Sequence, residues 1–475
     1  MKKFSQSAGK NKRLLIKYKK KKEKKMLKVV ETFSGIGSQA KALKNIGIDY
    51  EITCTADWDI NAMIAYDLIH HGKQDLSVYR NMTKQDLIQS LSKYTLSLDG
   101  KKPATEKNMQ DLSEDVLKRV LCAIRRSNNL VSITDIKAKD LPNRIDLLTY
   151  SFPCQDLSLA GNWHGNKSGI DRNAHNRSGM LWEVERILKE RIVEKMQLPR
   201  FLLMENVSNI LSDRHKDNFK EWTDYLEEIG YCNQIYTLDA SKFGIPQKRV
   251  RTYMLSVLVE NDSNKRRKVE NYFKEHNLED DKYVRTLNIK ERKLKECLRL
   301  DYTNEAYRIE ADMCQPNDTP SRKDIYEYNT KIYQNKKVTA QTVPTVTTKQ
   351  DRHPNSGVID YWNEKEGKSK FRYLTPRECF LLMGFDEEDY NNVVNNNFEH
   401  RKKKFFNIEK LNRMAGNSIV VNVLEEIFKQ VDYINNIIFM EEPELQFDQV
   451  SSIDRIKSKL AGLFNAQNEA YQVIK

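Results

Sequence analysis

The sequence has few cysteines, and their spacing does not suit a structural zinc site. Its seven Cys residues are scattered over 475 positions and no two stand in a CxxC pair, which argues against the usual zinc modules. An odd number of dispersed cysteines is also unlike a disulfide framework. We therefore expect a reducing, cytoplasmic setting and no bound metal.

Long hydrophobic runs are also missing. No apolar run approaches the ~18 residues that a membrane-spanning helix needs, and charged residues make up 31% of the chain. The basic N-terminus is not followed by the apolar core of a secretion signal. We expect no membrane attachment, and a chain long enough for two or three domains.

Most of the chain lacks net charge. Residues 1–28 hold 12 Lys, one Arg and one Glu, whereas the whole chain carries +13, so the remainder carries only about +1. We expect residues 1–26 to form a basic, disordered arm. Such an arm either attracts DNA phosphates without sequence preference or only aids solubility, and composition leaves both open.

The first apolar pattern predicts half of a nucleotide-type binding fold. Residues 27–33 have the pattern of a buried strand, residues 34–38 of a tight turn, and residues 40–46 of a helix closed by glycine. A second strand, 52–56, runs into Asp57. This order favours a cofactor site at the strand ends: a strand, a glycine turn, a helix, a second strand and then an acidic residue.

Further alternation of strands and helices predicts an α/β sheet with parallel strand order. Strands are expected at 145–150, 201–204 and 253–257, with a helix at 181–192. Residues from about 75 to 135 have the spacing of added amphipathic helices, and no motif there indicates a function. Within residues 254–371, which are polar, the Thr/Val-rich segment 338–346 is the one candidate for a strand pair.

Cys154 stands in a different context from the other cysteines. It follows a predicted buried strand and Pro153, precedes the polar Gln155, and leads into a glycine-rich loop at 161–179. The carboxyl edge of an open α/β sheet is where ligands bind. By itself, however, a lone cysteine is more often a small core residue than a nucleophile.

Three more segments carry groups suited to chemistry. Glu205 ends an apolar strand, and Arg249 and Arg251 alternate so that both lie on one face of a strand, where paired guanidinium groups suit a carboxylate or phosphate. Asp57 can accept hydrogen bonds from ribose hydroxyls, and Trp58 can stack on adenine. Each also has an ordinary explanation as a cap, an ion pair or a core residue.

Together and in this order, the segments resemble the motifs of the DNA cytosine-5 methyltransferases. The matching segments are Phe33-Ser34-Gly35-Ile36-Gly37, Asp135-Ile136, Pro153-Cys154-Gln155, Glu205-Asn206-Val207, Gln247-Lys248-Arg249-Val250-Arg251, Arg372-Tyr373-Leu374-Thr375-Pro376-Arg377-Glu378 and Gly416-Asn417-Ser418. The sequence departs from the family in the 78 positions between Asp57 and Asp135, where the family has a short gap.

The resemblance implies a Rossmann-like, S-adenosylmethionine-dependent methyltransferase domain with a smaller target-recognition domain. The implied catalytic domain is 27–258, with a helical insertion at about 75–135, and the chain returns to it at 372–433. The implied target-recognition domain is 259–371, and residues 434–475 are expected to be a helical extension.

The resemblance also implies roles for residues. The implied catalytic residues are Cys154, the nucleophile toward cytosine C6, Glu205, which contacts the ring nitrogen and amine, Arg251, and Arg249 in support. The implied cofactor-binding residues are Phe33, Ser34, Gly35, Gly37, Asp57, Trp58, Asp135, Ile136, Pro153, Asn417 and Ser418. The implied or expected DNA contacts are Gln155, Ser158, Lys167, Arg172, Arg177, Lys349 and Arg352.

The predicted activity is methylation of cytosine C5 in double-stranded DNA after the base is flipped out of the helix. A free-standing enzyme of this kind resembles the modification half of a bacterial or phage restriction–modification system. A cognate restriction endonuclease would be a functional rather than a physical partner, and we expect a monomer.

Three alternatives differ in substrate or class. An RNA (tRNA) cytosine-5 methyltransferase has similar motifs, but its relatives tend to have a shorter segment than the 118 residues of 254–371. A non-catalytic DNA-binding regulator would not need Cys154, Glu205 and both arginines. Amino-methyltransferases carry an Asp/Asn-Pro-Pro-aromatic motif where Pro153-Cys154-Gln155 stands.

Overall fold

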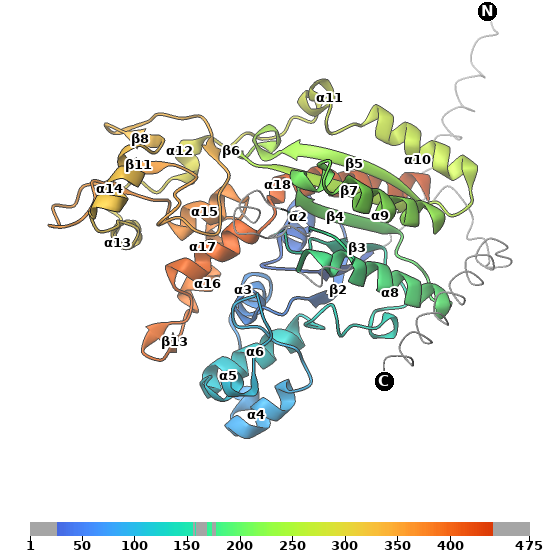
Figure 1. Ribbon diagram of the computed structural model, residues 1–475, viewed down its shortest axis with the longest axis horizontal. Helices are drawn as coiled ribbons and strands as arrows, with labels where there is room; N and C mark the ends of the chain where they lie inside the picture. The colour runs from blue at the N-terminus through green and yellow to red at the C-terminus, as the bar shows by residue number, and fades with distance from the viewer. Residues whose placement is uncertain (1–25, 155–156, 158–168, 173–176, 440–475) are drawn as a thin grey trace, which may run out of the picture.

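The computed structural model describes residues 26–154, 157, 169–172 and 177–439. A six-stranded sheet in the order β2-β1-β3-β4-β7-β5 forms its centre (Figure 1). Its strands are β1 (Leu27–Thr32), β2 (Tyr50–Ala56), β3 (Leu147–Tyr150), β4 (Phe201–Val207), β5 (Tyr231–Asp239) and β7 (Val250–Leu258).

Strand direction departs in one place from the predicted parallel order. β2, β1, β3 and β4 are mutually parallel, whereas β7 runs antiparallel to both of its neighbours, β4 and β5. Because β5 and β7 are joined by a short connection, the chain reverses between them. A parallel crossover needs a longer connection, and apolar content alone does not reveal that difference.

Helices cover both faces of this sheet. Alternate side chains of β1 explain the arrangement, since Val29 packs into the cluster with α2, α3 and α18 and Val30 into the cluster with α8 and α9. α10 lies along β5 (Figure 1). These helices are α2 (Ser38–Ile46), α3 (Ile60–His71), α8 (Leu181–Val193), α9 (Lys216–Glu228), α10 (Ser263–Glu275) and α18 (Val421–Tyr433).

The predicted insertion is helical and forms the lower projection in Figure 1. It contains η1 (Ser77–Tyr79), α4 (Lys84–Leu91), α5 (Glu106–Gln110) and α6 (Glu114–Arg126). Apolar residues of α4 and α6, including Leu87, Val116 and Val120, join the same core as α3. The insertion is therefore part of the main body of the protein.

A second, four-stranded sheet in the order β12-β11-β8-β9 lies at the opposite side of the molecule from α10 (Figure 1). We call residues 294–372, which contain it, the small lobe. Its elements are α12 (Leu294–Cys297), α13 (Glu305–Met313), α14 (Pro320–Glu327), β8 (Lys331–Gln334), β9 (Lys337–Val338), β11 (Val358–Asp360) and β12 (Phe371–Arg372).

The small lobe begins later in the chain than the predicted recognition domain. Arg266 of α10 donates a hydrogen bond to the carbonyl of Tyr231 (3.0 Å), and Gln430 of α18 donates to the carbonyl of His276 (2.7 Å). α11 (Asp281–Thr286) follows, with Val284 in the main core. Residues 259–287 therefore pack on the central sheet, although their polar composition resembles that of the lobe.

The expected strand pair at 338–346 is wrong. β9 pairs antiparallel with β8, whereas β10 (Val343–Pro344) pairs in parallel with β6 (Gln247–Lys248). β-branched residues favour extended backbone but do not select a partner. Each short piece pairs with a strand from elsewhere in the chain.

The chain returns from the small lobe to the main body through short elements at the left of Figure 1. These are α15 (Pro376–Leu382), α16 (Glu387–Asn395), β13 (Glu399–His400), β14 (Lys403–Lys404) and α17 (Ile408–Asn417). At the other side of the molecule, η6 (Ile434–Ile438) follows α18 and packs against α10. The remaining short helices of the described residues are η2 (Ala138–Asp140), η3 (Arg177–Met180), η4 (Ser208–Leu211) and η5 (Ala240–Phe243).

In the part of the chain that the structure describes, no helix is long and apolar enough to cross a membrane. The predictions for the basic arm at 1–26 and for the helical extension at 434–475 fall almost wholly outside the described residues.

Candidate active site

Cys154 lies just beyond the carboxyl end of β3, and the loop that holds it is fixed by hydrogen bonds to its backbone. The Asn206 amide donates to the carbonyl of Phe152 (3.0 Å), and the Ser178 hydroxyl donates to that of Pro153 (2.8 Å). The carbonyl of Cys154 itself accepts from the backbone N–H of Leu157 (3.0 Å). The thiol is therefore presented at the sheet edge by a restrained turn.

As a residue, Cys154 is partly exposed, whereas the other six cysteines are buried. Desolvation raises the pKa of Cys154, the positive charges of Arg251 and Arg249 lower it, and the negative charge of Glu205 raises it. The two arginines therefore partly offset the cost of forming a thiolate in this low-dielectric position.

Glu205 and Arg251 face each other across neighbouring strands. Glu205 is near the end of β4 and Arg251 near the start of β7, and Arg251 Nε lies 3.5 Å from Glu205 Oε1. Both side chains are mostly buried, at 12% and 16% exposed. Burial raises the pKa of Glu205, and Arg251 and Arg249 oppose that shift. The carboxyl group is thus easier to protonate than an exposed glutamate.

Arg249 has a different position from Arg251. Its guanidinium donates to the carbonyls of Val346 (2.9 Å), Gly416 (3.0 Å) and Ser418 (2.8 Å). Burial lowers its pKa to about 9, with the charge of Arg251 acting in the same direction. Arg249 therefore joins the strand edge to two distant segments, which is the geometry of a positioning residue.

Gly416 allows these segments to meet. A Cβ atom at this position would lie 2.4 Å from the backbone carbon of Thr347 and 2.4 Å from the backbone nitrogen of Thr348. Such a contact cannot be relieved by turning a side chain. Gly416 is therefore needed for close approach of the segment after β10 to the end of α17.

Gly416→Ala should destabilise the fold, even though alanine is the better helix former. Overpacking against backbone costs about 1–3 kcal/mol, which exceeds the ~0.5–1 kcal/mol that alanine gains in a helix. Urea unfolding measures the change in the free energy of unfolding. The methyl-transfer rate of the folded variant then shows whether displacement of residues 346–348 affects activity. A variant as stable and as active as the wild type would contradict the close approach.

The predicted cofactor turn is built around Asp57. The backbone N–H of Gly35 donates to Asp57 Oδ2 (2.8 Å), and that of Asp59 donates to Oδ1 (2.9 Å). Phe33 and Gly37 both have positive φ, 56° and 81°, so the chain turns sharply between β1 and α2.

Asp57 is itself held by the insertion. Its backbone N–H donates to Asn129 Oδ1 (3.2 Å), and Asn129 Nδ2 donates to the carbonyl of Asp57 (3.1 Å). Burial and the charge of Asp59 raise the pKa of Asp57 to about 6. Trp58 is half-buried against the main core. Asn129 was not a predicted site residue, because one asparagine 72 positions away carries no local signal.

Ser34 and Ser418 complete the connection between the turn and the C-terminal segment. Ser34 is buried and its backbone N–H donates to the carbonyl of Ala56 (3.3 Å). The Ser418 hydroxyl lies 2.6 Å from that of Ser38 at the start of α2. Asn417 is exposed at the end of α17. Asn417 and Ser418 do not cap the helix that follows them, because the N-cap of α18 is Val420.

Asp135 and Ile136 lie between the insertion and β3. Asp135 is exposed and Ile136 is buried. Arg186 of α8 donates to the carbonyl of Ile136 (2.8 Å). The structure thus places these two residues on the same side of the sheet edge as Asn129, and both line a cavity with it.

Several of the predicted DNA contacts fall outside the described residues. Gln155, Ser158 and Lys167, together with most of the 161–179 loop and the Arg177 side chain, lie outside the described residues. Lys349 and Arg352 are exposed, and Arg352 donates to the Ser321 hydroxyl (3.2 Å).

Arg172 has partners within the protein. Its guanidinium pairs with Glu185 (2.6 Å) and Glu221 (2.7 Å) and lies 3.7 Å from the ring centroid of Trp182. Two carboxylates already balance its charge, so this geometry does not support the expected phosphate contact. The sequence showed a cation beside glycines but not the acids on α8 and α9.

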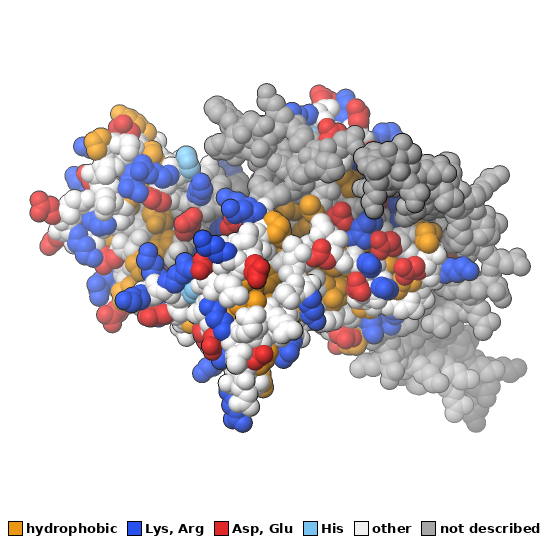
Figure 2. All heavy atoms as spheres, turned by 60° about the horizontal axis from the view of Figure 1, so that its bottom comes forward, with side chains coloured by type: hydrophobic (Ala, Val, Ile, Leu, Met, Phe, Trp, Pro, Cys, Tyr) orange, Lys and Arg blue, Asp and Glu red, His pale blue; other side chains and the backbone are white. Residues whose placement is uncertain are grey.

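Charge on the described surface is mixed. Figure 2 shows Lys and Arg side chains interspersed with Asp and Glu over the face it presents. That face therefore carries no broad basic stripe, which agrees with the near-zero net charge of residues 29–475.

Comparison with known proteins decides the family. The model for the C-5 cytosine-specific DNA methylases matches residues 82–432. The chain belongs to this family. It is therefore a DNA cytosine-5 methyltransferase, and its cofactor is S-adenosylmethionine.

Two curated relatives are similar over nearly their whole lengths. The orphan methyltransferase M.SssI of Spiroplasma monobiae is 33% identical over 86% of this chain and 97% of the relative. The type II methyltransferase M2.ScrFI of Lactococcus lactis subsp. cremoris is 30% identical over 86% of this chain and 99% of the relative. The relatives of this chain thus include a methyltransferase of restriction–modification type. The comparisons do not favour the alternatives of an RNA methyltransferase or a non-catalytic DNA-binding regulator.

The fold has solved counterparts. The Dnmt2 methyltransferase of S. pombe superposes with a TM-score of 0.51 and 17% identity, over 86% of this chain and all of that chain. The methyltransferase fold predicted from the sequence is confirmed. The family model matches from residue 82 onward, so the turn at residues 33–58 precedes the matched residues.

Proposed function

We propose that Cys154, Glu205 and Arg251 carry out methylation of cytosine C5 in duplex DNA. The observation that supports this assignment most is their convergence at one sheet edge. Cys154 follows β3, and the Glu205–Arg251 pair spans the adjacent β4 and β7 with 3.5 Å between Nε and Oε1. Both charges act on the pKa of the thiol.

Each group has a defined task. The Cys154 thiolate adds to C6 of cytosine, which makes C5 electron-rich. Glu205 donates a proton to the ring nitrogen as the electrons move toward it. Arg251 holds the cytosine carbonyl oxygen and the Glu205 carboxyl in place. After C5 is methylated, the ring nitrogen returns its proton to Glu205. A base then removes the C5 proton, the C5–C6 double bond re-forms, the S–C6 bond breaks, and its electron pair returns to Cys154 as thiolate.

The residues around the cofactor turn fit S-adenosylmethionine, which supplies the methyl group when bound. Asp57 is a partly buried carboxylate with lone pairs beyond those used by Gly35 and Asp59, and these can accept ribose hydroxyls. Trp58 provides an aromatic face and Asp135 an exposed acceptor for an adenine amine. Phe33, Pro153, Asn417 and Ser418 are assigned to the same site.

Binding of the cofactor should weaken as the pH falls through about 6, where Asp57 becomes protonated. The protonated form is a poorer acceptor for hydroxyl donors, and its ionised fraction falls tenfold for each pH unit below the pKa. Isothermal titration calorimetry from pH 5 to 7 measures this slope. Asp57→Asn should bind the cofactor more weakly at pH 7, and its affinity should no longer depend on pH in this range. If the variant keeps the pH dependence, a group other than Asp57 is responsible for it.

We further propose that the target cytosine is flipped into the site and that residues 259–371 read the DNA sequence. The target atom is inaccessible within the base stack, and base edges are read in the grooves. Residues 342–353, which include Lys349 and Arg352, contain β10, and Thr347 and Thr348 lie beside Gly416 at the end of α17. This path joins the recognition segment directly to Arg249.

The proposed enzyme is encoded by a bacterium or a phage and is located in the bacterial cytoplasm. There it acts as a monomer on host or phage DNA. Methylation there would protect DNA from a cognate restriction endonuclease. Bisulfite sequencing of DNA from expressing cells should show one protected sequence context.

Transfer of labelled methyl groups to duplex DNA and to tRNA then separates the substrates. Labelling of the duplex alone is expected. Labelling of tRNA alone would overturn the substrate, and labelling of neither, with DNA binding retained, would leave a regulator.

A further inference from the structure

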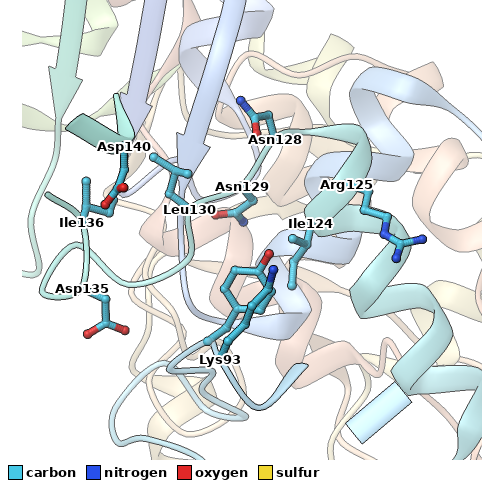
Figure 3. Close-up of a pocket in the computed structure, with 10 residues that line it drawn as sticks. Lys93, Ile124, Arg125, Asn128, Asn129, Leu130, Asp135, Ile136 and Asp140 are labelled. Carbon is cyan, nitrogen blue, oxygen red and sulfur yellow. The ribbon is translucent and has the colours of Figure 1, made fainter. Parts of the chain in front are cut away.

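A cavity of about 440 Å³ lies between the helical insertion and the carboxyl edge of the central sheet (Figure 3). This volume is within the range of ligand pockets, roughly 300–1,000 Å³. Its lining residues are Lys93, Tyr94, Ile124, Arg125, Asn128, Asn129, Leu130, Asp135, Ile136 and Asp140.

The lining comes from two sources. Asp135 and Ile136, which belong to the proposed cofactor set, lie on one side of the cavity in Figure 3, and Lys93 and Ile124 lie toward the other. Lys93 and Tyr94 follow α4, and Ile124 is in α6. The insertion therefore supplies a wall that a family member with a short gap would not have.

The insertion is also bonded to the end of the cofactor strand. The backbone N–H of Ser97 donates to the carbonyl of Trp58 (2.8 Å), and that of Ile60 donates to the carbonyl of Ser97 (3.0 Å). On the other side, Leu130 donates from its backbone N–H to the carbonyl of Thr55 (2.8 Å). Tyr94, three residues before Ser97, is thereby held close to the segment that follows β2.

The chemistry of the cavity suits a purine nucleoside. Ile124 and Ile136 are buried apolar walls, and the exposed carboxylate of Asp135 offers an acceptor. The ring of Tyr94 is half-buried, with the ammonium of Lys93 4.9 Å from its centroid. Among the described residues the Tyr94 hydroxyl has no hydrogen-bond partner, so it is free to bond a ligand. Apolar faces with polar groups at the edge are what a flat heteroaromatic base requires.

We propose that the insertion is part of the cofactor site, and that Tyr94, with Lys93 packed over it, contacts the adenosine end of S-adenosylmethionine. This assignment rests on the proposed cofactor role of Asp135 and Ile136. It gives the insertion a function that the sequence alone did not indicate. It also makes cofactor affinity depend on residues outside the matched sequence motifs.

Direct binding measurements test the assignment. Isothermal titration calorimetry with S-adenosylmethionine and with S-adenosylhomocysteine should show Tyr94→Ala binding both about tenfold more weakly, because an aromatic contact is lost. Tyr94→Phe, which keeps the ring and loses only the hydroxyl, should bind more tightly than Tyr94→Ala. Lys107→Ala, an exposed change on α5 of the same insertion, is the matched control and should not change affinity. Affinity for duplex DNA without cofactor should be the same in all variants.

Two further variants make each outcome decisive. Tyr94→Leu keeps apolar volume and replaces Tyr94→Ala if the latter does not fold, as judged by thermal unfolding without ligand. Asp135→Ala tests the proposed cofactor site itself. If Asp135→Ala weakens binding and neither Tyr94 variant does, the role of the insertion is wrong and the proposed site stands. If Asp135→Ala also binds normally, the proposed cofactor site is wrong.

Discussion

Replacing Cys154 with serine should abolish methyl transfer while leaving DNA binding intact. A serine hydroxyl is nearly the same size but ionises far less readily than a thiol, so addition to C6 is lost. We expect turnover to fall on the order of 10⁴-fold or more, as for other nucleophile replacements. Steady-state transfer of labelled methyl groups measures the loss, and electrophoretic mobility shift measures DNA affinity.

A matched control separates this effect from disturbance of the fold. Cys232 is buried on β5, away from the sheet edge that carries Cys154. Cys232→Ser should keep methyl transfer, with any loss confined to stability because a hydroxyl is placed in an apolar cluster. Full turnover in the Cys154 variant would remove it from the mechanism. Equal losses in both variants would point to a general structural effect.

Glu205→Gln should lower the rate of methyl transfer about 10²- to 10⁴-fold, the usual contribution of a general acid. Glutamine keeps the hydrogen-bonding shape but cannot transfer its proton to the ring nitrogen. Because burial raises the pKa of Glu205, the wild-type residue can be protonated while Cys154 is ionised. DNA binding should change little, since the amide fills the same space.

The pH profile provides a second reading of the same variant. The active form, with a thiolate and a neutral carboxyl, carries the same number of protons as the form with a thiol and a carboxylate. The wild-type rate should therefore not change with pH between the pKa of Glu205 and the pKa of Cys154. It should decrease below the lower pKa and above the higher one. Without Glu205 only ionisation of Cys154 matters, so the variant's rate should rise tenfold per pH unit below the thiol pKa. A level profile in the variant would contradict the role of Glu205 as the acid. Single-turnover rates from pH 6 to 9 make the comparison.

The sequence predicted well the features that depend on local pattern. Apolar periodicity placed β1, β2, β3 and β4 and the helices α2 and α8 to within a few residues. Because parallel strands end at the same edge of a sheet, the ends of β2, β3 and β4 also predicted that Asp57, Cys154 and Glu205 would lie at one edge. That prediction needed no knowledge of side-chain partners.

Features that depend on distant partners were not predictable. The sequence predicted that Arg172 would contact phosphate, because it could not show that Glu185 of α8 and Glu221 of α9 lie beside it. Arg249 was predicted as a residue in support of Arg251, but its partners could not be predicted: it donates to carbonyls 97 and 167 positions away. The insertion carried no motif at all, since Tyr94 and Asn129 gain significance only from the strand end against which they fold.

The most direct test of the central claim is to trap the cysteine on the target base. Duplex DNA carrying 5-fluorocytosine at the target accepts the thiolate at C6 and the methyl group at C5. The fluorine cannot leave as the C5 proton does, so the S–C6 bond persists. Digestion and mass spectrometry should then find the nucleotide on the peptide that contains Cys154, and no adduct should form with Cys154→Ser. An adduct on any other residue, or an undiminished adduct in the serine variant, would contradict the assignment of Cys154 as the nucleophile.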